Sequence, residues 1–264
     1  MDRKRVAHTT VAGVPVAISS EADLAAILVE DAKLNRDGDL ASAQTMLSCN
    51  GQSLSLFAKD RAFAQAIERA DLVHADGQFI VWMSRLFGKA AVPERTATTD
   101  LIHAAAQAAA DNGLSFYLLG SGEDVNRDCA AELTRRYPGL RIAGRRNGYF
   151  ADEDVDAIVA DINASGADFL WVGLGKPKEQ IFAEHQKANL NCAWIVSCGG
   201  CFHFVVGDYA RAPEWMQRSG MEWLHRLMSR PKQLLGRYLY TVPHAIVLVL
   251  WHGLTSKSRE RAQG

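Results

Sequence analysis

The stretch Ala70-Asp-Leu-Val-His-Ala-Asp-Gly-Gln78 joins a short apolar run to the pair Asp76-Gly77. The run over residues 70–75 predicts a β-strand, and the Asp-Gly pair predicts a turn at its carboxyl end. Open α/β sheets hold their ligands at this edge. Asp76 is therefore a candidate general base, because a neighbouring glycine lets a ligand approach its carboxylate. The alternative is a turn without a chemical role, since Asp-Gly is common in turns.

Strand-like and helix-like segments alternate along most of the chain. The predicted strands are 11–18, 44–49, 71–75, 115–119, 140–143, 168–173 and 192–197, and the predicted helices are 21–34, 54–69, 98–111, 123–136, 152–163 and 178–188. Such alternation is typical of βαβ units. We therefore predict an α/β fold with a Rossmann-like, mainly parallel sheet flanked by helices, as one compact body over residues 1–210.

Residues 211–264 differ from this body in charge and composition. The formal net charge is −1, but residues 1–210 carry 20 Lys and Arg against 27 Asp and Glu, whereas residues 211–264 carry 9 against 3. Aromatic and apolar residues are interleaved with these basic ones, and a seven-residue apolar run covers 245–251. Seven residues are too few to cross a bilayer, which takes about 20. We expect a basic, aromatic-rich helical appendage that docks at the membrane interface and closes the active site. The alternative is a core-facing helix pair.

Three predicted strand ends carry glycine-rich loops, at residues 119–122, 172–175 and 197–200. Backbone N–H groups at such turns bind phosphate, so three of them along one sheet edge predict a nucleotide site. Neither a Walker A motif nor a strand-linked GxGxxG is present, which argues against an NTPase and against a nucleotide-sugar oxidoreductase that uses NAD. We expect no cofactor.

Two acidic pairs resemble those that hold a divalent metal on a nucleotide-sugar. Asp37-Gly-Asp39 lies in a polar loop, however, and Asp152-Glu-Asp154 opens a predicted helix, where acids favour the positive end of the dipole. We therefore expect no metal, and Arg or Lys side chains must then neutralise a departing diphosphate. The five cysteines are scattered, which indicates a reducing compartment, and the CxxC at 198–201 is interpreted as a glycine-rich turn rather than a redox or metal site.

A series of motifs runs in order from Val11 to about Tyr238. These motifs are Ser48-Cys-Asn50, Ala75-Asp-Gly77, Arg95 to Asp100, Leu118-Leu-Gly120, Pro138-Gly139, Asn147-Gly-Tyr-Phe150, Val172-Gly-Leu-Gly175 with Pro177-Lys178, Arg211-Ala-Pro213, Glu222-Trp223, Arg226-Leu227 and Arg230-Pro231. The series resembles the WecG/TagA/CpsF glycosyltransferases, glycosyltransferase family 26. It covers nearly the whole chain.

The resemblance implies an inverting, metal-independent transfer of a sugar from a UDP-sugar to a polyprenyl-diphosphate-linked saccharide. Such an enzyme would be cytoplasmic, peripheral on the inner face of the cell membrane, and would act in bacterial cell-surface or exopolysaccharide biosynthesis. No nucleic-acid partner is expected, and homo-oligomerisation stays open.

The resemblance also assigns residues to roles. The catalytic set would be Asp76 as the base with Asn50, Ser48 and Arg95. The donor-binding set would be Gly120, Tyr149, Gly173, Gly175, Lys178, Glu179, Gln180 and His203. The residues that bind diphosphate or acceptor would be Arg211, Arg218, Arg226, Arg230 and Arg237.

Four features depart from the family's motifs. His203 stands where the family usually has Asp, Glu179-Gln180 reverses the usual order, Thr98 replaces Gly, and the two cysteines at 198 and 201 fill small or apolar positions. These departures affect the contacts to the donor sugar and base more than the reaction class. They motivate one alternative, a non-catalytic nucleotide-sugar-binding homologue, against which the retention of the predicted base speaks.

Overall fold

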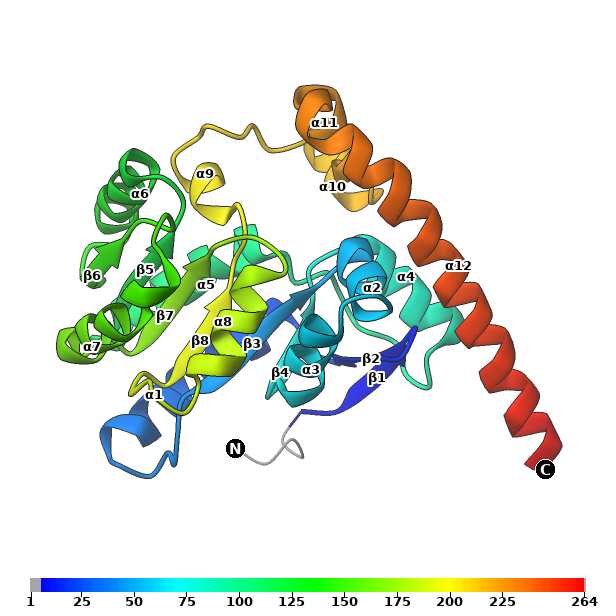
Figure 1. Cartoon of the computed structure of the whole chain (residues 1–264), viewed down its shortest axis with the longest axis horizontal. Helices are drawn as coiled ribbons and strands as arrows, with labels where there is room; N and C mark the ends of the chain where they lie inside the picture. Colours follow the sequence, from blue (N-terminus) through cyan, green and yellow to red (C-terminus); the bar gives the residue numbers. More distant parts are fainter. Residues whose placement is uncertain (1–5, 264) are drawn as a thin grey trace.

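Six parallel strands form the central sheet, in the order β4-β3-β8-β7-β5-β6 (Figure 1). The computed structural model describes residues 6–263, with the side chains of 218, 233 and 256–263 left out. The strands are β3 (Gln44–Cys49), β4 (Leu72–Ala75), β5 (Ser115–Gly120), β6 (Arg141–Arg146), β7 (Phe169–Gly173) and β8 (Trp194–Ser197). The predicted α/β, Rossmann-like architecture is confirmed.

Helices cover both faces of this sheet, because the central strands are apolar on both sides. In β5, Phe116 and Leu118 join one core cluster, and Tyr117 and Leu119 join the other. The first face carries α1 (Glu21–Arg36), α5 (Thr98–Asp111), α6 (Glu123–Arg136) and α9 (Cys201–Val205). The second carries α2 (Gly51–Phe57), α3 (Arg61–Arg69), α4 (Gln78–Phe87), α7 (Val155–Ser165), which follows the short 3₁₀ turn η2 (Asp152–Asp154), and α8 (Lys178–Gln186).

The structure differs from the sequence-based prediction at the amino-terminal end. Residues 11–18 are not one strand of the main sheet. Instead, β1 (His8–Val11) and β2 (Val14–Ala17) form a separate antiparallel hairpin. The chain reverses at Ala12 and Gly13, whose φ angles are 48° and 85°. A continuous strand cannot accommodate these left-handed conformations.

The helix predicted over 54–69 is also wrong, because two helices occupy this region. α2 ends at Phe57, and Asp60 begins α3 by accepting a hydrogen bond from the N–H of Phe63 at 3.0 Å. Such an N-cap satisfies one of the free N–H groups that every helix start exposes. The sequence-based prediction also omitted α4, which directly follows Gly77.

The carboxyl-terminal part is helical, as expected, with α10 (Glu214–Arg218), α11 (Glu222–Ser229) and α12 (Pro231–Gln263). Figure 1 shows α12 as a long helix along one side of the molecule, beside α2 and α4. One side of α12 is buried there: Ala245 and Val249 join the core, and His244 Nδ1 lies 2.8 Å from Ser55 Oγ.

The apolar part of α12 is longer than the seven residues inferred from the sequence, because the helix continues through Pro243. The segment Leu234–Thr255 covers 22 residues and contains an 18-residue window with a mean hydropathy of 1.3. By length and composition alone it could cross a membrane. Length therefore does not decide how this helix meets a membrane. The division of the chain at residue 210 stays a proposal.

Candidate active site

The carboxyl ends of β3 and β4 bring Asn50 and Asp76 together. Cys49 and Ala75 are paired in the sheet register, so the next residue of each strand emerges at the same place. The N–H of Asp76 donates to the carbonyl of Cys49 at 2.9 Å, which fixes the turn. Parallel strands all end at the same edge of the sheet, so the residues that follow them lie close together there.

The side-chain amide of Asn50 donates to the Asp76 carboxylate because its other polar atom, Oδ1, caps α2. Its Oδ1 caps the helix by accepting from the N–H groups of Gln52 at 3.1 Å and Ser53 at 3.3 Å. The oxygen is thus committed, and Nδ2 is left to donate to Asp76 Oδ2 at 3.0 Å. Helix capping therefore sets the orientation of the predicted catalytic amide.

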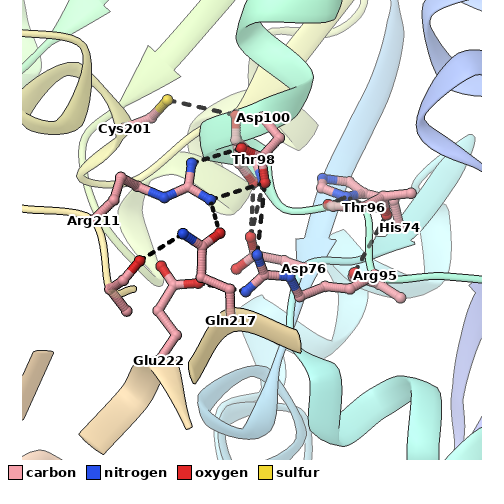
Figure 2. Close-up of polar contacts among 12 residues, drawn as sticks. His74, Asp76, Arg95, Thr96, Thr98, Asp100, Cys201, Arg211, Gln217 and Glu222 are labelled. Carbon is pink, nitrogen blue, oxygen red and sulfur yellow. Dashed lines mark hydrogen bonds and ion pairs between the residues drawn. The ribbon is translucent and has the colours of Figure 1, made fainter. Parts of the chain in front are cut away.

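The start of α5 supplies the other contacts to Asp76. Its Oδ1 accepts from the backbone N–H of Thr98 at 3.0 Å and from the Thr98 hydroxyl at 3.2 Å. A helix amino terminus favours a carboxylate through its free N–H groups and its dipole. Thr98, which departs from the family's motif, thus adds a second donor to the predicted base. Figure 2 shows these contacts.

The loop before α5 is held by the buried His74 of β4. His74 Nδ1 lies 2.8 Å from the carbonyl oxygen of Thr96, and a carbonyl only accepts, so Nδ1 carries the proton. Burial lowers the pKa of His74, so the ring is neutral at physiological pH. This contact places the Thr98 donors in front of Asp76.

Lys176, which the sequence-based prediction missed, reaches the same place from the end of β7. Its Nζ donates to the Ser48 carbonyl at 2.8 Å and to Ser53 Oγ at 2.6 Å. Burial alone would raise the pKa of Asp76, but Lys176 and the hydrogen bonds from Thr98 and Asn50 together hold it below its ordinary value. Asp76 is thus ionised at neutral pH. One signal was available, since a lysine stands in the glycine loop directly after Gly175.

A second polar cluster joins the carboxyl-terminal helices to the start of α5 (Figure 2). Arg211 donates to both oxygens of Asp100 at 2.6 and 3.1 Å, and to Gln217 Oε1 at 2.6 Å. Arg95 pairs with Glu222 of α11 at 2.5 Å. The structure thus brings the predicted Arg95 and Arg211 together, through carboxylates whose role the sequence did not reveal.

The glycines at the strand ends serve close packing first. Gly120 and Gly173 are paired in register, and a Cβ on Gly120 would overlap the carbonyl group of Gly173. Gly120 has φ of 143°, which few other residues adopt. Gly175 differs, because a Cβ there would meet nothing within 4 Å. Of these glycines, Gly175 leaves open space beside its backbone.

Glu179 is buried and ties two of these loops together. Its Oε2 accepts from the N–H groups of Gly175 at 3.0 Å and Gly199 at 2.9 Å, and its Oε1 accepts from Gln180 Nε2 at 3.0 Å. Burial raises its pKa. Both Glu179 and Gln180 are fully buried at this position, so they shape the loops around a donor rather than lie at the surface. Lys178, by contrast, is exposed.

His203 lies in a stacked group at the start of the carboxyl-terminal part. Its ring stacks on Tyr209 with centroids 4.5 Å apart, and its Nδ1 lies 3.0 Å from Asp208 Oδ2. The guanidinium of Arg230 covers the Tyr209 ring at 3.8 Å, and that of Arg226 lies 5.1 Å from the Phe204 ring.

The remaining predicted residues lie at several places. Ser48 is buried within β3 and contributes its backbone carbonyl to Lys176. Tyr149 is 84% exposed, in the loop after β6. Arg237 of α12 has a buried Nε for which the described residues offer no hydrogen-bond partner. The side chain of Arg218 lies outside the described residues.

Within the described residues, no group of three or more His, Cys, Asp or Glu side chains could hold a metal ion. The expected independence of metal nevertheless stays a prediction. Cys198 and Cys201 are buried free thiols, and burial raises the pKa of each well above its usual range. A buried thiol is a poor nucleophile and a poor metal ligand until it ionises.

The comparison with known protein families agrees with the geometry. The model of the glycosyl transferase WecG/TagA/CpsF family matches residues 9–259, from β1 through most of α12. The family comprises glycosyltransferases, which supports a hexosyltransferase activity, and it implies a nucleotide-sugar donor and a lipid-linked acceptor in general terms. The chain belongs to the WecG/TagA/CpsF family of glycosyltransferases.

Proposed function

We propose that this glycosyltransferase moves a sugar from a UDP-sugar to a polyprenyl-diphosphate-linked saccharide, with inversion and without metal. Asp76 takes the proton from the attacking acceptor hydroxyl. The single observation that carries the proposal is its carboxylate, ionised and anchored at the carboxyl edge of the sheet. It is only partly buried, so an acceptor hydroxyl can reach it.

The transfer itself needs one base and one stabilised leaving group. The acceptor oxygen bonds to the anomeric carbon as the bond from that carbon to the diphosphate breaks, and UDP leaves with the electron pair. The acceptor proton passes to Asp76. A base that is weak in the free enzyme still serves here, because the hydroxyl becomes more acidic as its oxygen bonds to carbon.

Basic side chains near the site support a leaving diphosphate in place of a metal. Arg95 and Arg211 lie beside the start of α5, and their present carboxylate partners keep them oriented. The Nε of Arg237 and that of Arg211 are buried and have no hydrogen-bond partner among the described residues. Guanidinium groups bind phosphate oxygens through such N–H groups.

The surface of the carboxyl-terminal helices supports docking on the inner face of the cell membrane. The exposed large apolar side chains there include Trp215, Trp223, Met228, Leu239, Val247 and Trp251. The opposite side of α12 is buried against α2 and α4, which favours a helix lying in the interface over one that leaves the body to cross the bilayer. A lipid-linked acceptor is presented at that interface.

The decisive experiment offers a panel of donors to the full-length protein with a polyprenyl-diphosphate-linked acceptor. UDP-glucose, UDP-glucuronate and UDP-N-acetylmannosamine derivatives are tested for acceptor-dependent UDP release and for product stereochemistry. We expect one donor to give an inverted product. UDP release that does not depend on the acceptor, or a product with retained configuration, contradicts the proposal.

Asp76→Asn is the matched variant for this assay. It removes the base but keeps a side chain of the same shape, so turnover falls by about 10²–10⁴-fold while the melting temperature and UDP affinity stay close to those of the parent protein. An Asp76→Asn protein with near-normal turnover rules out Asp76 as the base.

A further inference from the structure

Lys176 is a partly buried cation for which the proposed transfer has assigned no role. It follows Gly175 in the loop between β7 and α8, and its ammonium lies against the end of β3 through Ser48 and Ser53. A lysine is rarely buried unless an opposite charge compensates it. Ser53, which contacts Lys176, also donates to Asn50 Oδ1 at 3.3 Å, and Asn50 Nδ2 donates to Asp76 at 3.0 Å. The Asp76 carboxylate, directly after β4, is thus the nearby opposite charge that compensates Lys176 most.

The charged and titratable groups around this pair come from several elements. Asp76 faces Lys176 and His74, and it also raises the pKa of the Cys49 and Cys201 thiols. Lys176 in turn faces Asp76, Glu179, Cys49 and Arg237. Burial is the largest influence on the pKa of Lys176 and lowers it, and the carboxylates of Asp76 and Glu179 oppose this effect. Because the thiols and the imidazole are neutral at physiological pH, Lys176 is the main positive charge that faces Asp76.

We propose that Lys176 is a positioning residue for the transfer, and that its ammonium supplies the positive charge that keeps the partly buried Asp76 carboxylate ready to accept a proton. The same charge resets the base. Once Asp76 has taken the acceptor proton, the uncompensated ammonium favours release of that proton to solvent. This inference rests on the proposed function, since it takes Asp76 as the base.

The pH dependence of kcat/KM tests the inference, because it reports the pKa of the base in the free enzyme. An opposite charge nearby lowers the pKa of a carboxyl group by about 1–3 units. Asp76 is active when deprotonated, so activity is lost as the pH falls through its pKa. Lys176→Met therefore moves the acid limb of the profile to higher pH by about one pH unit or more. Lys176→Arg keeps the charge and leaves the limb close to that of the parent protein.

Lys187→Met is the matched control. Lys187 is also a partly buried lysine paired with an aspartate, since its Nζ lies 2.5 Å from Asp71 Oδ2. That pair stands at the opposite, amino end of β4. We expect the loss of the Lys187–Asp71 pair to change stability without moving the acid limb of the kcat/KM profile. A purely structural role of Lys176 predicts the same result for both lysines.

The two variants Asp76→Asn and Lys176→Met together distinguish a failure of this inference from a failure of the proposed function. If Asp76→Asn is inactive but Lys176→Met keeps the acid limb of the parent protein, the inference is overturned and the proposed function stands. If Asp76→Asn stays active, the proposed base is wrong, whatever the lysine does.

Should the Met variant fail to fold, the titration of the parent protein decides the question. We expect the ¹³C carboxyl signal that disappears in Asp76→Asn to titrate below the ordinary value for aspartate. Titration at or above that value overturns the inference.

Discussion

At the scale of single residues, the proposed base Asp76 depends on an asparagine that contacts two neighbours. The Oδ1 of Asn50 caps α2, and its Nδ2 donates to Asp76. A residue with two acceptor oxygens could keep the cap but could not donate. Asn50 therefore couples the start of a helix to the protonation state of the base.

Replacement of Asn50 by aspartate separates these two roles. Asn50→Asp keeps the N-cap, since Asp and Asn cap equally well. It also places a second carboxylate against Asp76, and two carboxylates that share a site raise the pKa of one of them strongly. We expect turnover at neutral pH to fall and the acid limb of kcat/KM to move to higher pH. An unchanged pH profile contradicts the contact between Asn50 and Asp76.

At the scale of elements, the loops at the carboxyl ends of β5, β7 and β8 are packed against one another. Gly120 and Gly173 meet through their backbones, and Gly148 donates its N–H to the carbonyl of Ser121 at 2.8 Å. Glu179 then joins the loops after β7 and β8. These loops form one supported rim on which a donor can be held.

This packing predicts a sharp difference between two glycines of the same loop. Gly120→Ala places a Cβ onto the Gly173 carbonyl at a φ of 143°, so we expect a loss of about 2–4 kcal/mol in the free energy of unfolding. Gly122→Ala is the control, because a Cβ there meets nothing within 4 Å, and it costs less than about 1 kcal/mol. Urea denaturation of both variants measures the difference. Equal stabilities contradict the described packing of the rim.

At the scale of the whole molecule, the basic carboxyl-terminal helices share one surface with the site. Glu222 of α11 pairs with Arg95, and α12 packs along α2, whose first turn is capped by Asn50. The helices that expose the apolar side chains thus also contact the residues around the base. If these helices dock on a membrane, a shift in their position can be transmitted to Arg95 and Asn50 through these contacts.

Membrane docking predicts a dependence on lipid charge and on salt. Each basic residue near an anionic surface contributes about 1 kcal/mol, and salt screens this attraction. We expect the full-length protein to sediment with vesicles that contain anionic lipid at low salt and to be released as salt rises. Vesicles of neutral lipid are the control. Failure to bind anionic vesicles even at low salt means that the exposed apolar surface serves another contact.

Independence of metal is tested by chelation. In the proposed transfer the basic side chains supply the positive charge that a leaving diphosphate needs, so we expect turnover to survive EDTA. Loss of turnover that Mg²⁺ or Mn²⁺ restores would return attention to the acidic pairs at 37–39 and 152–154.

The sequence by itself determined the order of most strands and helices along the chain, and it pointed to Asp76 at a strand end as the proposed base. Alternating apolar segments gave the parallel sheet its strands within a few residues, since periodicity is a local property. Motif order pointed to the family, which the match over residues 9–259 confirms. The hairpin of β1 and β2 and the break before α3 were missed, because both depend on a single turn or cap.

Only the tertiary structure decided which charges face one another. Lys176 and Asp76 are a hundred positions apart in the chain. They lie near each other because β7 and β4 end at the same edge of the sheet, where Ser53 and Asn50 stand between them. The pairing of Arg95 with Glu222 likewise depends on how α11 packs over the start of α5. Side-chain electrostatics act over a few ångströms of space, whatever the separation along the chain. A linear pattern can therefore point to the proposed base but not to the cation that we propose keeps it ionised.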